Sequence, residues 1–564
     1  MVTKYVATDP SVGNDNNSGD DAGHPWLSFQ KSIDRLVALR TNPQETCTLM
    51  IMNYQVNEPA ALKGPSYSKF EFIGVTIANV NNDPHQEVLF CEPRVRLTSW
   101  DATKSIFTIE AADDILFKNL QLFDSNGGGG VSADNAKRVH LLTCCIHGNK
   151  AKRGGGILFD NCTDATVEKC RVWENEATVR DGGGGDFVMC KGATIKGSVF
   201  YSNKAKDSGG ALSFYKCTGD IVVEGNTFGE PQKRGNKAKI GGAVAADSCE
   251  NVFFGSASGK NTFTWNEASE NGGALSLKLC KYAQIVRDVF ADNSVTGAIT
   301  GGGAIYSGGS DLTIHEADID HNHSAMAGGG IKVRGENDSN HNLVDGKLTL
   351  QECLIHRNDA TSEGGGLRAK NVAVTITNCS FYERNTGSAG GGLSFSDSMS
   401  GGGKHKLEIQ GGKFQENAAG GSGGGCDIFE GEFSIDSTEF TENKAKWGGG
   451  LCFFGTLPNV FVDLESCRFA DNEAQTGGAA HFYGAVHGRI QTNRIIDNQA
   501  GVGAGLHFDY DVVRSLKVTG NTFSGNKGTG DIVVEQDRST PPMTVAELEK
   551  DNTVGKAVPV VIVK

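Results

Sequence analysis

Between residues 120 and 530 the chain repeats one pattern of apolar and polar positions. An apolar residue is followed by two variable residues, an asparagine, and a run of glycines that leads into another apolar stretch, as in residues 200–212 and 263–275. Fifteen such asparagines follow one another from residue 126 to residue 526, about 29 residues apart on average. A fixed period of this length predicts a solenoid, in which each repeat packs against its neighbours.

The inner pattern of each repeat predicts strands. Segments such as 157–177 and 211–228 contain short alternating apolar stretches rich in Val, Ile, Phe and Thr, broken by Gly, Asn and Asp, and they lack helical periodicity. Two or three short strands per repeat indicate an all-β fold, a right-handed parallel β-helix of about fifteen or more coils.

Stacking of the coils would place equivalent residues in columns. Asparagine suits such a column because it tolerates a left-handed backbone at a turn and its amides can form a hydrogen-bonded ladder. The predicted ladder residues are Asn126, Asn149, Asn175, Asn203, Asn236, Asn266, Asn293, Asn322, Asn358, Asn385, Asn417, Asn443, Asn472, Asn498 and Asn526.

The glycine runs predict sharp corners, where a positive φ or a close approach of neighbouring coils excludes a Cβ atom. The aliphatic residue after each run should point into the core. Examples are Leu212, Leu275, Ile305, Leu367 and Leu451.

The cysteines follow the repeat and form two predicted columns. Cys144, Cys170, Cys353, Cys379 and Cys467 each precede the apolar position by two residues, and Cys162, Cys190, Cys217, Cys249 and Cys280 recur after the glycine-entered strand. A disulfide or metal ladder is the functional alternative, but there is no C-x-x-C pair, and parallel stacking holds sulfurs near the coil spacing. We therefore expect buried, reduced thiols that pack as small hydrophobic groups.

The two ends differ from the repeats. Residues 1–45 predict an N-terminal strand and a capping helix with Leu27, Phe29, Ile33, Leu36 and Val37 on one face, residues 46–122 predict irregular coils, and 123–530 carry the regular repeats. Residues 531–564 predict a cap or an assembly strand, with a short helix at 545–550 and an apolar strand at 558–563. Self-association into filaments through residues 5–8 and 558–563 is a further prediction, because terminal strands carry unpaired edges.

Composition and charge exclude some partners. The net charge of -14 and the pI near 5.5 disfavour nucleic acid and anionic lipid, which attract clustered Lys and Arg. No window approaches 18 uninterrupted apolar residues, so we expect no transmembrane segment, and the first 21 residues show no leader pattern.

The paired F-x-x-N and G-G-A-[ILV] motifs, as in residues 200–212 and 263–275, resemble the repeats of chlamydial polymorphic membrane proteins. This resemblance covers roughly residues 120–530 and implies an exported adhesin at the cell surface. The opening, residues 5–36, is similar to the N-terminal region of extracellular pectin-lyase-like β-helix proteins, including polysaccharide lyases. An extracellular or cell-surface location is therefore expected.

One segment concentrates polar chemistry. It supplies His315, Asp318, Asp320, His321, His323, Lys332 and Arg334, which could act as acid, base and cation in a lateral groove. Ordinary solvent-facing positions of a coil explain the same residues. The glycine runs lack the Lys-Ser/Thr of a phosphate loop, and the G-G-x-G-x-D spacing of calcium β-rolls is not sustained, so no cofactor or metal is predicted.

Two functions remain open. The first is an exported structural or adhesive β-helix that binds a surface glycan or protein or assembles with copies of itself. The second is a polysaccharide lyase or glycoside hydrolase that acts in a lateral groove, which clustered titratable groups with perturbed pKa values would distinguish.

Overall fold

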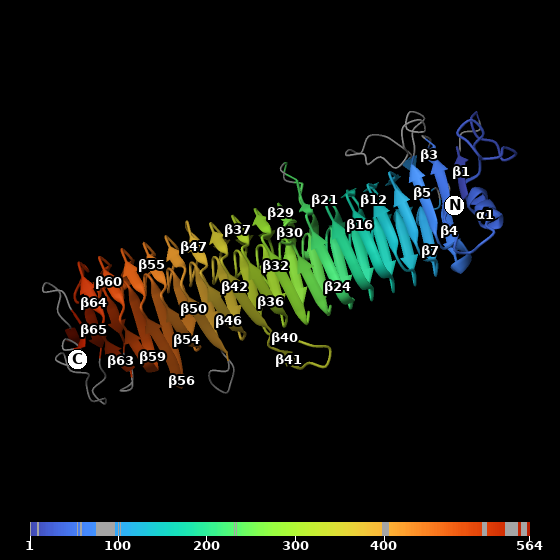
Figure 1. Ribbon diagram of the computed structural model, residues 1–564. Helices are drawn as coiled ribbons and strands as arrows, with labels where there is room; N and C mark the ends of the chain where they lie inside the picture. The colour runs from blue at the N-terminus through green and yellow to red at the C-terminus, as the bar shows by residue number, and fades with distance from the viewer. Residues whose placement is uncertain are drawn as a thin grey trace. The chain divides into compact units, whose positions relative to one another are not determined.

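The computed structural model describes residues 2–7, 11–52, 55–56, 59–74, 96–99, 101, 103–230, 232, 234–397, 405–509, 516–535, 551–553 and 561–563. The chain divides into two compact units. Unit 1 comprises residues 1–268 and 280–282, and unit 2 comprises residues 269–279 and 283–564. Each unit is a parallel β-helix whose strands stack coil upon coil (Figure 1).

One coil of unit 2 shows the plan. A first strand, β45 (Leu367–Lys370), is followed by a second, β46 (Ala373–Thr377), a third, β47 (Ser380–Tyr382), and a two-residue strand, β48 (Thr386–Gly387). Each pairs in parallel with its equivalent in the next coil, so that Leu367 lies beside Leu393 and Val374 beside Leu407. The same arrangement recurs in unit 1, where β23 (Leu212–Tyr215) lies between β19 (Gly185–Val188) and β27 (Val244–Asp247).

The first strands of unit 2 position the site described below. In chain order they are β31 (Leu275–Lys278), β35 (Ile305–Gly308), β39 (Ile331–Arg334), β45, β49 (Leu393–Ser396), β53 (Cys426–Phe429), β56 (Leu451–Glu465), β59 (Ala480–Gln491), β62 (Leu506–Phe508) and β65 (Ile532–Glu535). The strands β56 and β59 continue through the corner into the second strand of their coils.

The core lies inside the coils. The aliphatic residues that follow the glycine corners are fully buried, as the sequence predicts. Phenylalanines of the third strands stack on one another in unit 2, with ring centroids of Phe381, Phe414, Phe440 and Phe469 4.7 to 5.0 Å apart. Such columns bury large aromatic areas and favour one register.

Both predicted reasons for glycine at the corners, a positive φ and a close approach of the next coil, are present. Gly448 has a φ of +62°, and a Cβ atom on Gly449 would lie 2.5 Å from the carbonyl oxygen of Gly478 in the next coil. A side chain at Gly449 would therefore push neighbouring coils apart.

The asparagine ladder is confirmed within each unit. The side-chain amide of one asparagine donates to the Oδ1 atom of the next, over 2.8 to 3.1 Å, along 149, 175, 203, 236 and 266 in unit 1 and along 293, 322, 358, 385, 417, 443, 472, 498 and 526 in unit 2. These asparagines are buried, and their amides also donate to backbone carbonyls of the preceding coil, as Asn443 does to Phe414.

Two parts of the ladder prediction are wrong. Asn126 is exposed, and the fully buried Ser125 takes its place, with its backbone N–H donating to Asn149 Oδ1 at 3.1 Å. The reason is register: Leu122, not Phe123, pairs with Ile146, so the offset of three residues leads to position 125. The left-handed backbone also falls on the residue before the ladder asparagine, such as Glu442 with a φ of +57°.

A second polar ladder lies at the turn between the second and third strands. Asn226 donates to Asn261 at 3.2 Å in unit 1, and Asn493 donates to Asn521, which donates to Asn552, at 2.9 Å in unit 2. The first cysteine column shares these positions, because the backbone N–H of Cys467 donates to Asn493 Oδ1. Asparagine, serine and cysteine thus alternate in one stacked position.

The cysteines of both predicted columns are buried and free. In the second column the thiols lie 3.3 to 3.6 Å from carbonyl oxygens of the preceding coil, as Cys217 does from Phe187 O. A buried thiol satisfied by a backbone carbonyl packs as a small side chain.

The N-terminal helix α1 (Phe29–Leu39) packs on the first coils of unit 1. It buries Phe29, Ile33 and Leu36, and the ring of Phe29 lies 5.9 Å from that of Phe107. Leu27 precedes the helix and Val37 is half-buried. Across the described ranges no helix is long and apolar enough to cross a membrane.

The ends pair within the chain. Strand β1 (Val2–Val6) pairs with β2 (Cys47–Ile51), and β66 (Val561–Val563) pairs with β65. The predicted helix at 545–550 and residues 558–560 of the predicted strand lie outside the described residues, as does Thr8.

Candidate functional site

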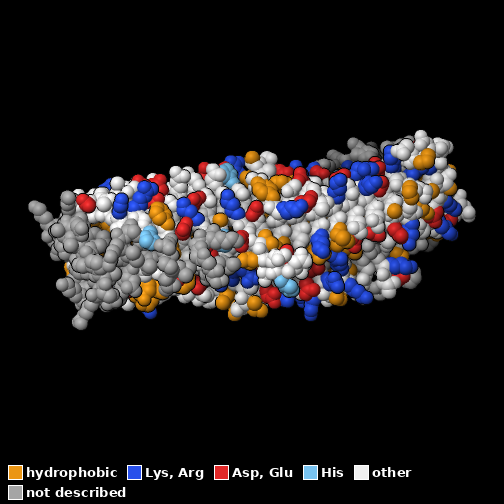
Figure 2. Space-filling view, turned by 90° about the horizontal axis from the view of Figure 1, so that it is seen from below, with side chains coloured by type: hydrophobic (Ala, Val, Ile, Leu, Met, Phe, Trp, Pro, Cys, Tyr) orange, Lys and Arg blue, Asp and Glu red, His pale blue; other side chains and the backbone are white. Residues whose placement is uncertain are grey.

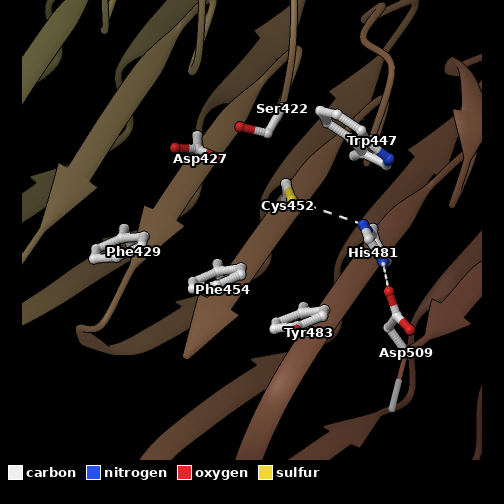
Figure 3. A pocket seen from close by; sticks show the side chains of 9 residues that line it. All are labelled: Ser422, Asp427, Phe429, Trp447, Cys452, Phe454, His481, Tyr483 and Asp509. Carbon is white, nitrogen blue, oxygen red and sulfur yellow. Dashed lines mark hydrogen bonds and ion pairs between the residues drawn. The ribbon is translucent and has the colours of Figure 1, made fainter. Parts of the chain in front are cut away.

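A pocket of about 430 Å³ lies on the outer face of the first strands of unit 2 (Figure 3). Alternate residues of these strands face the core, and those between them face outward. In-register pairing therefore places Asp427, Cys452, His481 and His507 in one outward column, one residue per coil. The first three residues of this floor column, Asp427, Cys452 and His481, form the floor of the pocket.

The floor is covered although it faces outward. Cys452 and His481 are only 5% and 6% exposed, because the turn before each glycine corner lies over the strand face. Ser422 and Trp447 belong to this turn and line the pocket with the floor residues. Trp447 keeps 47% of its surface exposed and forms an aromatic edge above the floor.

The opposite wall is a stack of aromatic rings. Phe429, Phe454 and Tyr483 occupy the second outward column, with centroids 5.1 and 4.6 Å apart and nearly parallel planes (Figure 3). The stacked rings face one another along the column, so they present their edges to the pocket. Aromatic walls with a polar floor are typical of ligand sites.

Asp427 and His507, in the floor column, have strongly shifted pKa values. Burial raises the pKa of Asp427 to about 6, although a hydrogen bond to Ser422 and the charge of Arg368 partly counteract burial. Burial and the neighbouring His481 lower the pKa of His507 to about 4, so this imidazole is neutral at pH 7. Perturbed pKa values in a pocket indicate a functional site.

Cations occupy the same face in earlier coils. Lys332 and Arg368 lie in the floor column, three and two coils before Asp427, and Arg334 lies in the second column. Burial lowers the pKa of Lys332 to about 8, and its ammonium donates to Thr300 O at 2.6 Å. The buried Arg368 pairs with Glu363 at 2.5 Å.

The structure separates the polar patch predicted from the sequence. Successive strands of a coil face different sides, so the seven residues fall into groups. His315 ends β36 (Asp311–His315), Asp318 and Asp320 lie on β37 (Asp318–Asp320), His321 follows in a turn, His323 lies on β38 (His323–Ser324), and Lys332 and Arg334 lie on β39. Of the seven residues, Lys332 and Arg334 lie on the same face as the pocket. The sequence had predicted that all seven would form a single patch.

The two aspartates of the patch gather around a histidine of the next coil. His356 is nearly buried, with Nε2 2.8 Å from Asp318 Oδ1 and Nδ1 3.3 Å from Asp320 Oδ1. Arg357 donates two hydrogen bonds to Asp320, at 2.9 and 3.1 Å. His323 instead pairs with Asp359 at 3.0 Å. These contacts join side chains of neighbouring coils.

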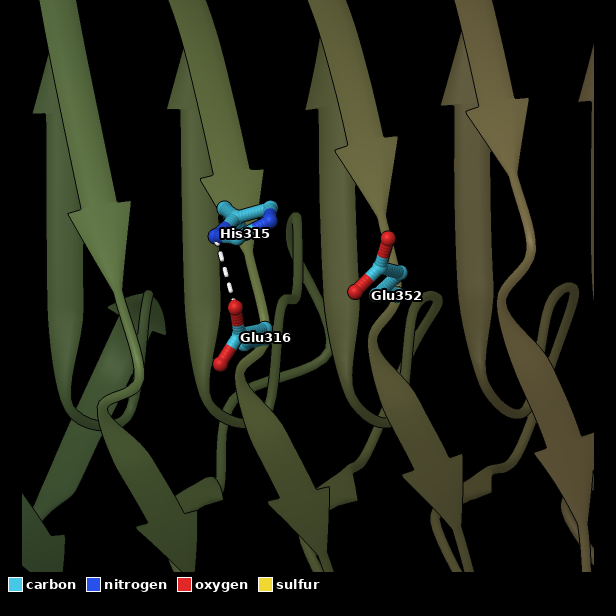
Figure 4. A group of neighbouring side chains, drawn as sticks. All are labelled: His315, Glu316 and Glu352. Atoms are coloured by element: carbon cyan, nitrogen blue, oxygen red, sulfur yellow. Dashed lines mark ion pairs between the residues drawn. The ribbon is translucent and has the colours of Figure 1, made fainter. Parts of the chain in front are cut away.

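One group of side chains could hold a cation. His315, Glu316 and Glu352 present ligand atoms within 4.8 Å of one another, at the ends of the second strands of two neighbouring coils of unit 2 (Figure 4). Glu316 already pairs with Arg287 at 2.5 Å, and this guanidinium lowers the pKa of its carboxyl. Arg287 thus supplies a positive charge beside Glu316, as a metal ion at this place would.

Unit 1 has a shallower polar site. A pocket of about 570 Å³ is lined by Asp114, Arg138 and His140, among other residues of the second strands. Arg138 donates to both carboxylate oxygens of Asp114, and this pairing lowers the pKa of Asp114. Burial lowers the pKa of His140. On the described part of the face shown in Figure 2, Lys and Arg side chains are interspersed with Asp and Glu side chains.

Sequence reasoning missed the floor of the main pocket. Asp427, Cys452 and His481 each follow the buried residue after a glycine corner. In the next coil His507 has this position, and Asp509 lies two residues after His507, as Tyr483 lies two residues after His481. That shared place in the repeat was the available signal. A comparison of the outward positions coil by coil would have aligned these different residue types.

The fold and this site define a parallel β-helix protein with a lateral pocket. The chain belongs to the right handed beta helix family, whose model matches residues 98–254 and 369–541. This match and the strand pairing confirm the predicted fold class.

Comparison with curated proteins gives no match. Two solved structures, of the PL6 family alginate lyase AlyGC and of a point variant, are similar to this chain at 9% identity and a TM-score of 0.21, over 95% of this chain and 99% of theirs. At that TM-score the likeness adds nothing to the strand pairing and the family match.

Proposed function

We propose that the protein is an exported β-helix that binds a glycan chain along the outer face of the first strands of unit 2. The single observation that carries the proposal is the pocket of about 430 Å³ with aromatic walls and a polar floor. The resemblance of the repeats to polymorphic membrane proteins supports export and a surface role.

Sugars fit this combination of surfaces. A pyranose ring presents apolar C–H groups beside hydroxyls, so it suits a site in which aromatic side chains lie opposite hydrogen-bonding groups. Phe429, Phe454 and Trp447 supply the apolar contacts, and Asp427 and His481 supply acceptors and donors. The coil spacing of about 4.8 Å repeats such contacts along the face, which suits an extended ligand.

A binding test follows from the exposed phenylalanines. Phe429 in the pocket wall is 41% exposed, and Phe461, on the second-strand part of β56, is 45% exposed. We expect Phe429→Ala to weaken glycan binding about 5-fold, as expected for the loss of about 1 kcal/mol of aromatic contact. The matched control Phe461→Ala should bind as the wild type does.

Titration calorimetry with acidic and neutral polysaccharides measures this difference. Equal affinity of the two variants would show that the ligand does not use the pocket. Absence of binding by the wild type to the whole panel would overturn the proposal.

A second candidate is cleavage of the bound glycan by a lyase or hydrolase reaction. It is favoured by Asp427, whose pKa of about 6 suits proton transfer near neutral pH. Screening the same polysaccharides for new reducing ends or unsaturated products tests it. Cleavage is supported if Asp427→Asn abolishes the activity while glycan binding persists. The cleavage proposal is refuted if the wild type releases no product.

A further inference from the structure

Cys452, His481 and Asp509 are aligned across three successive coils at the pocket (Figure 3). The Sγ atom of Cys452 lies 4.0 Å from Nδ1 of His481, and Nε2 of His481 lies 3.8 Å from Oδ2 of Asp509. The order thiol, imidazole, carboxylate is that of a nucleophile, its base and the group that orients the base. Such contacts are often loose without substrate and tighten when it binds.

Cys452 differs in its surroundings from the structural cysteines. Cys426, in the preceding coil, faces the core between Leu393 and Leu451 and is fully buried. Cys452 is the next residue after Leu451 and faces the pocket instead. The repeat therefore places one thiol inside the core and another, one coil later, beside a histidine at the ligand face.

We propose that Cys452, His481 and Asp509 cleave an acyl ester carried by the glycan that this pocket binds. The inference rests on the proposed function for the identity of the ligand. The ester follows from the chemistry of the nucleophile, because a thiolate attacks an acyl carbonyl carbon readily, whereas the glycosidic carbon is an acetal. The substrate class is thus an O-acylated glycan.

The reaction balances with water as the second substrate. His481 takes the Cys452 proton as the S–C bond forms, and then gives that proton to the leaving sugar oxygen as the C–O bond breaks. Water attacks the resulting thioester, its proton passes through His481 to the sulfur, and the carboxylic acid leaves. The indole N–H of Trp447 lines the same pocket and is the donor available to the oxyanion.

The thiol needs its base. Burial raises the pKa of Cys452 well above its usual value, so the free thiol is protonated at pH 7. Proton transfer to His481 in the reacting complex is the available route to the thiolate. Asp509 acts as a positioning residue, since its carboxylate faces Nε2 of His481.

The full chain is tested for hydrolysis of p-nitrophenyl acetate and of an O-acetylated polysaccharide. We expect Cys452→Ser and Cys452→Ala to lose at least about 100-fold in rate, as expected for removal of a nucleophile. The control Cys426→Ser should keep the wild-type rate. Absence of hydrolysis by the wild type, or equal rates for Cys452→Ala and the wild type, would overturn the inference.

Alkylation by iodoacetamide, followed by peptide mass mapping, tests the relay without a substrate. Cys452 should be labelled before Cys426, and His481→Gln should slow that labelling about 10-fold. An unchanged labelling rate in His481→Gln would overturn the relay. The two proposals fail in different ways. Glycan binding without ester hydrolysis would refute the esterase proposal alone. Hydrolysis of p-nitrophenyl acetate without glycan binding would refute the glycan as the ligand.

Discussion

Removal of one rung from the asparagine ladder tests how the coils are held together. Asn443 is fully buried, its amide donates to Phe414 O at 2.8 Å and to Asn472 Oδ1 at 2.9 Å, and its Oδ1 accepts from the backbone and side-chain N–H groups of Asn417. Asn443→Ala leaves the Phe414 carbonyl and two Asn417 donors without these partners. At about 1–3 kcal/mol for each unsatisfied buried group, the free energy of unfolding should fall by about 3–9 kcal/mol.

The measurement is equilibrium urea unfolding followed by tryptophan fluorescence. Lys444, the next residue, is exposed and pairs with Glu473 at 2.8 Å, so Lys444→Ala should cost less than about 1 kcal/mol. In a solenoid the loss should be largest in the coils beside the substitution, since each coil contacts its neighbours. If Asn443→Ala were no less stable than Lys444→Ala, the ladder would not be what stabilises the turn.

Three further substitutions probe the pocket and the corners. Asp427→Asn should remove the loss of stability expected in the wild type as pH rises from about 4 to about 6, because the folded carboxyl, with a pKa of about 6, holds its proton more tightly than the unfolded one; urea unfolding at pH 4 and pH 7 measures this. His507→Gln should remove the loss expected as pH falls from about 6.5 to about 4, since the folded imidazole, with a pKa of about 4, resists protonation; melting temperatures across that range decide it. Gly449→Ala should lower the melting temperature, because its Cβ would lie 2.5 Å from Gly478 O, whereas Gly420→Ala, 4.0 Å from its nearest neighbour, should not.

The sequence predicted what every coil shares. The ladder asparagines, the glycine corners and the inward aliphatic residues recur at the same place, because a stacked position imposes the same constraint each time. The error at Asn126 arose where the repeat begins: Ser125 fits the stacked turn, and the nearby asparagine matched the motif by letter but not by register. The second polar ladder escaped notice because asparagine, serine and cysteine share its position.

The pocket could not be predicted in the same way, because its chemistry lies where coils differ. Ser394, Asp427, Cys452, His481 and His507 occupy equivalent outward positions in five successive coils. A search for recurring residues discards these positions as variable. The polar segment chosen from the sequence failed for the opposite reason, since residues close in the chain were assumed to be close in space, and successive strands of a coil carried them to different sides.

The same geometry explains how a repetitive fold can carry one specific site. Backbone pairing and the asparagine ladder fix the coils through inward and turn positions, so the outward column is free to vary without cost to the stack. Because the turn before the glycine corner lies over that column, its side chains are withdrawn from water, and burial shifts the pKa values of Asp427 and His507 in opposite directions. The esterase relay needs both conditions, a variable column that brings Cys452 beside His481 and a cover that excludes water. If the cover matters, Trp447→Ala should raise the exposure of Cys452, speeding its alkylation by iodoacetamide, while it slows ester hydrolysis, and a parallel change in the two rates would contradict this account.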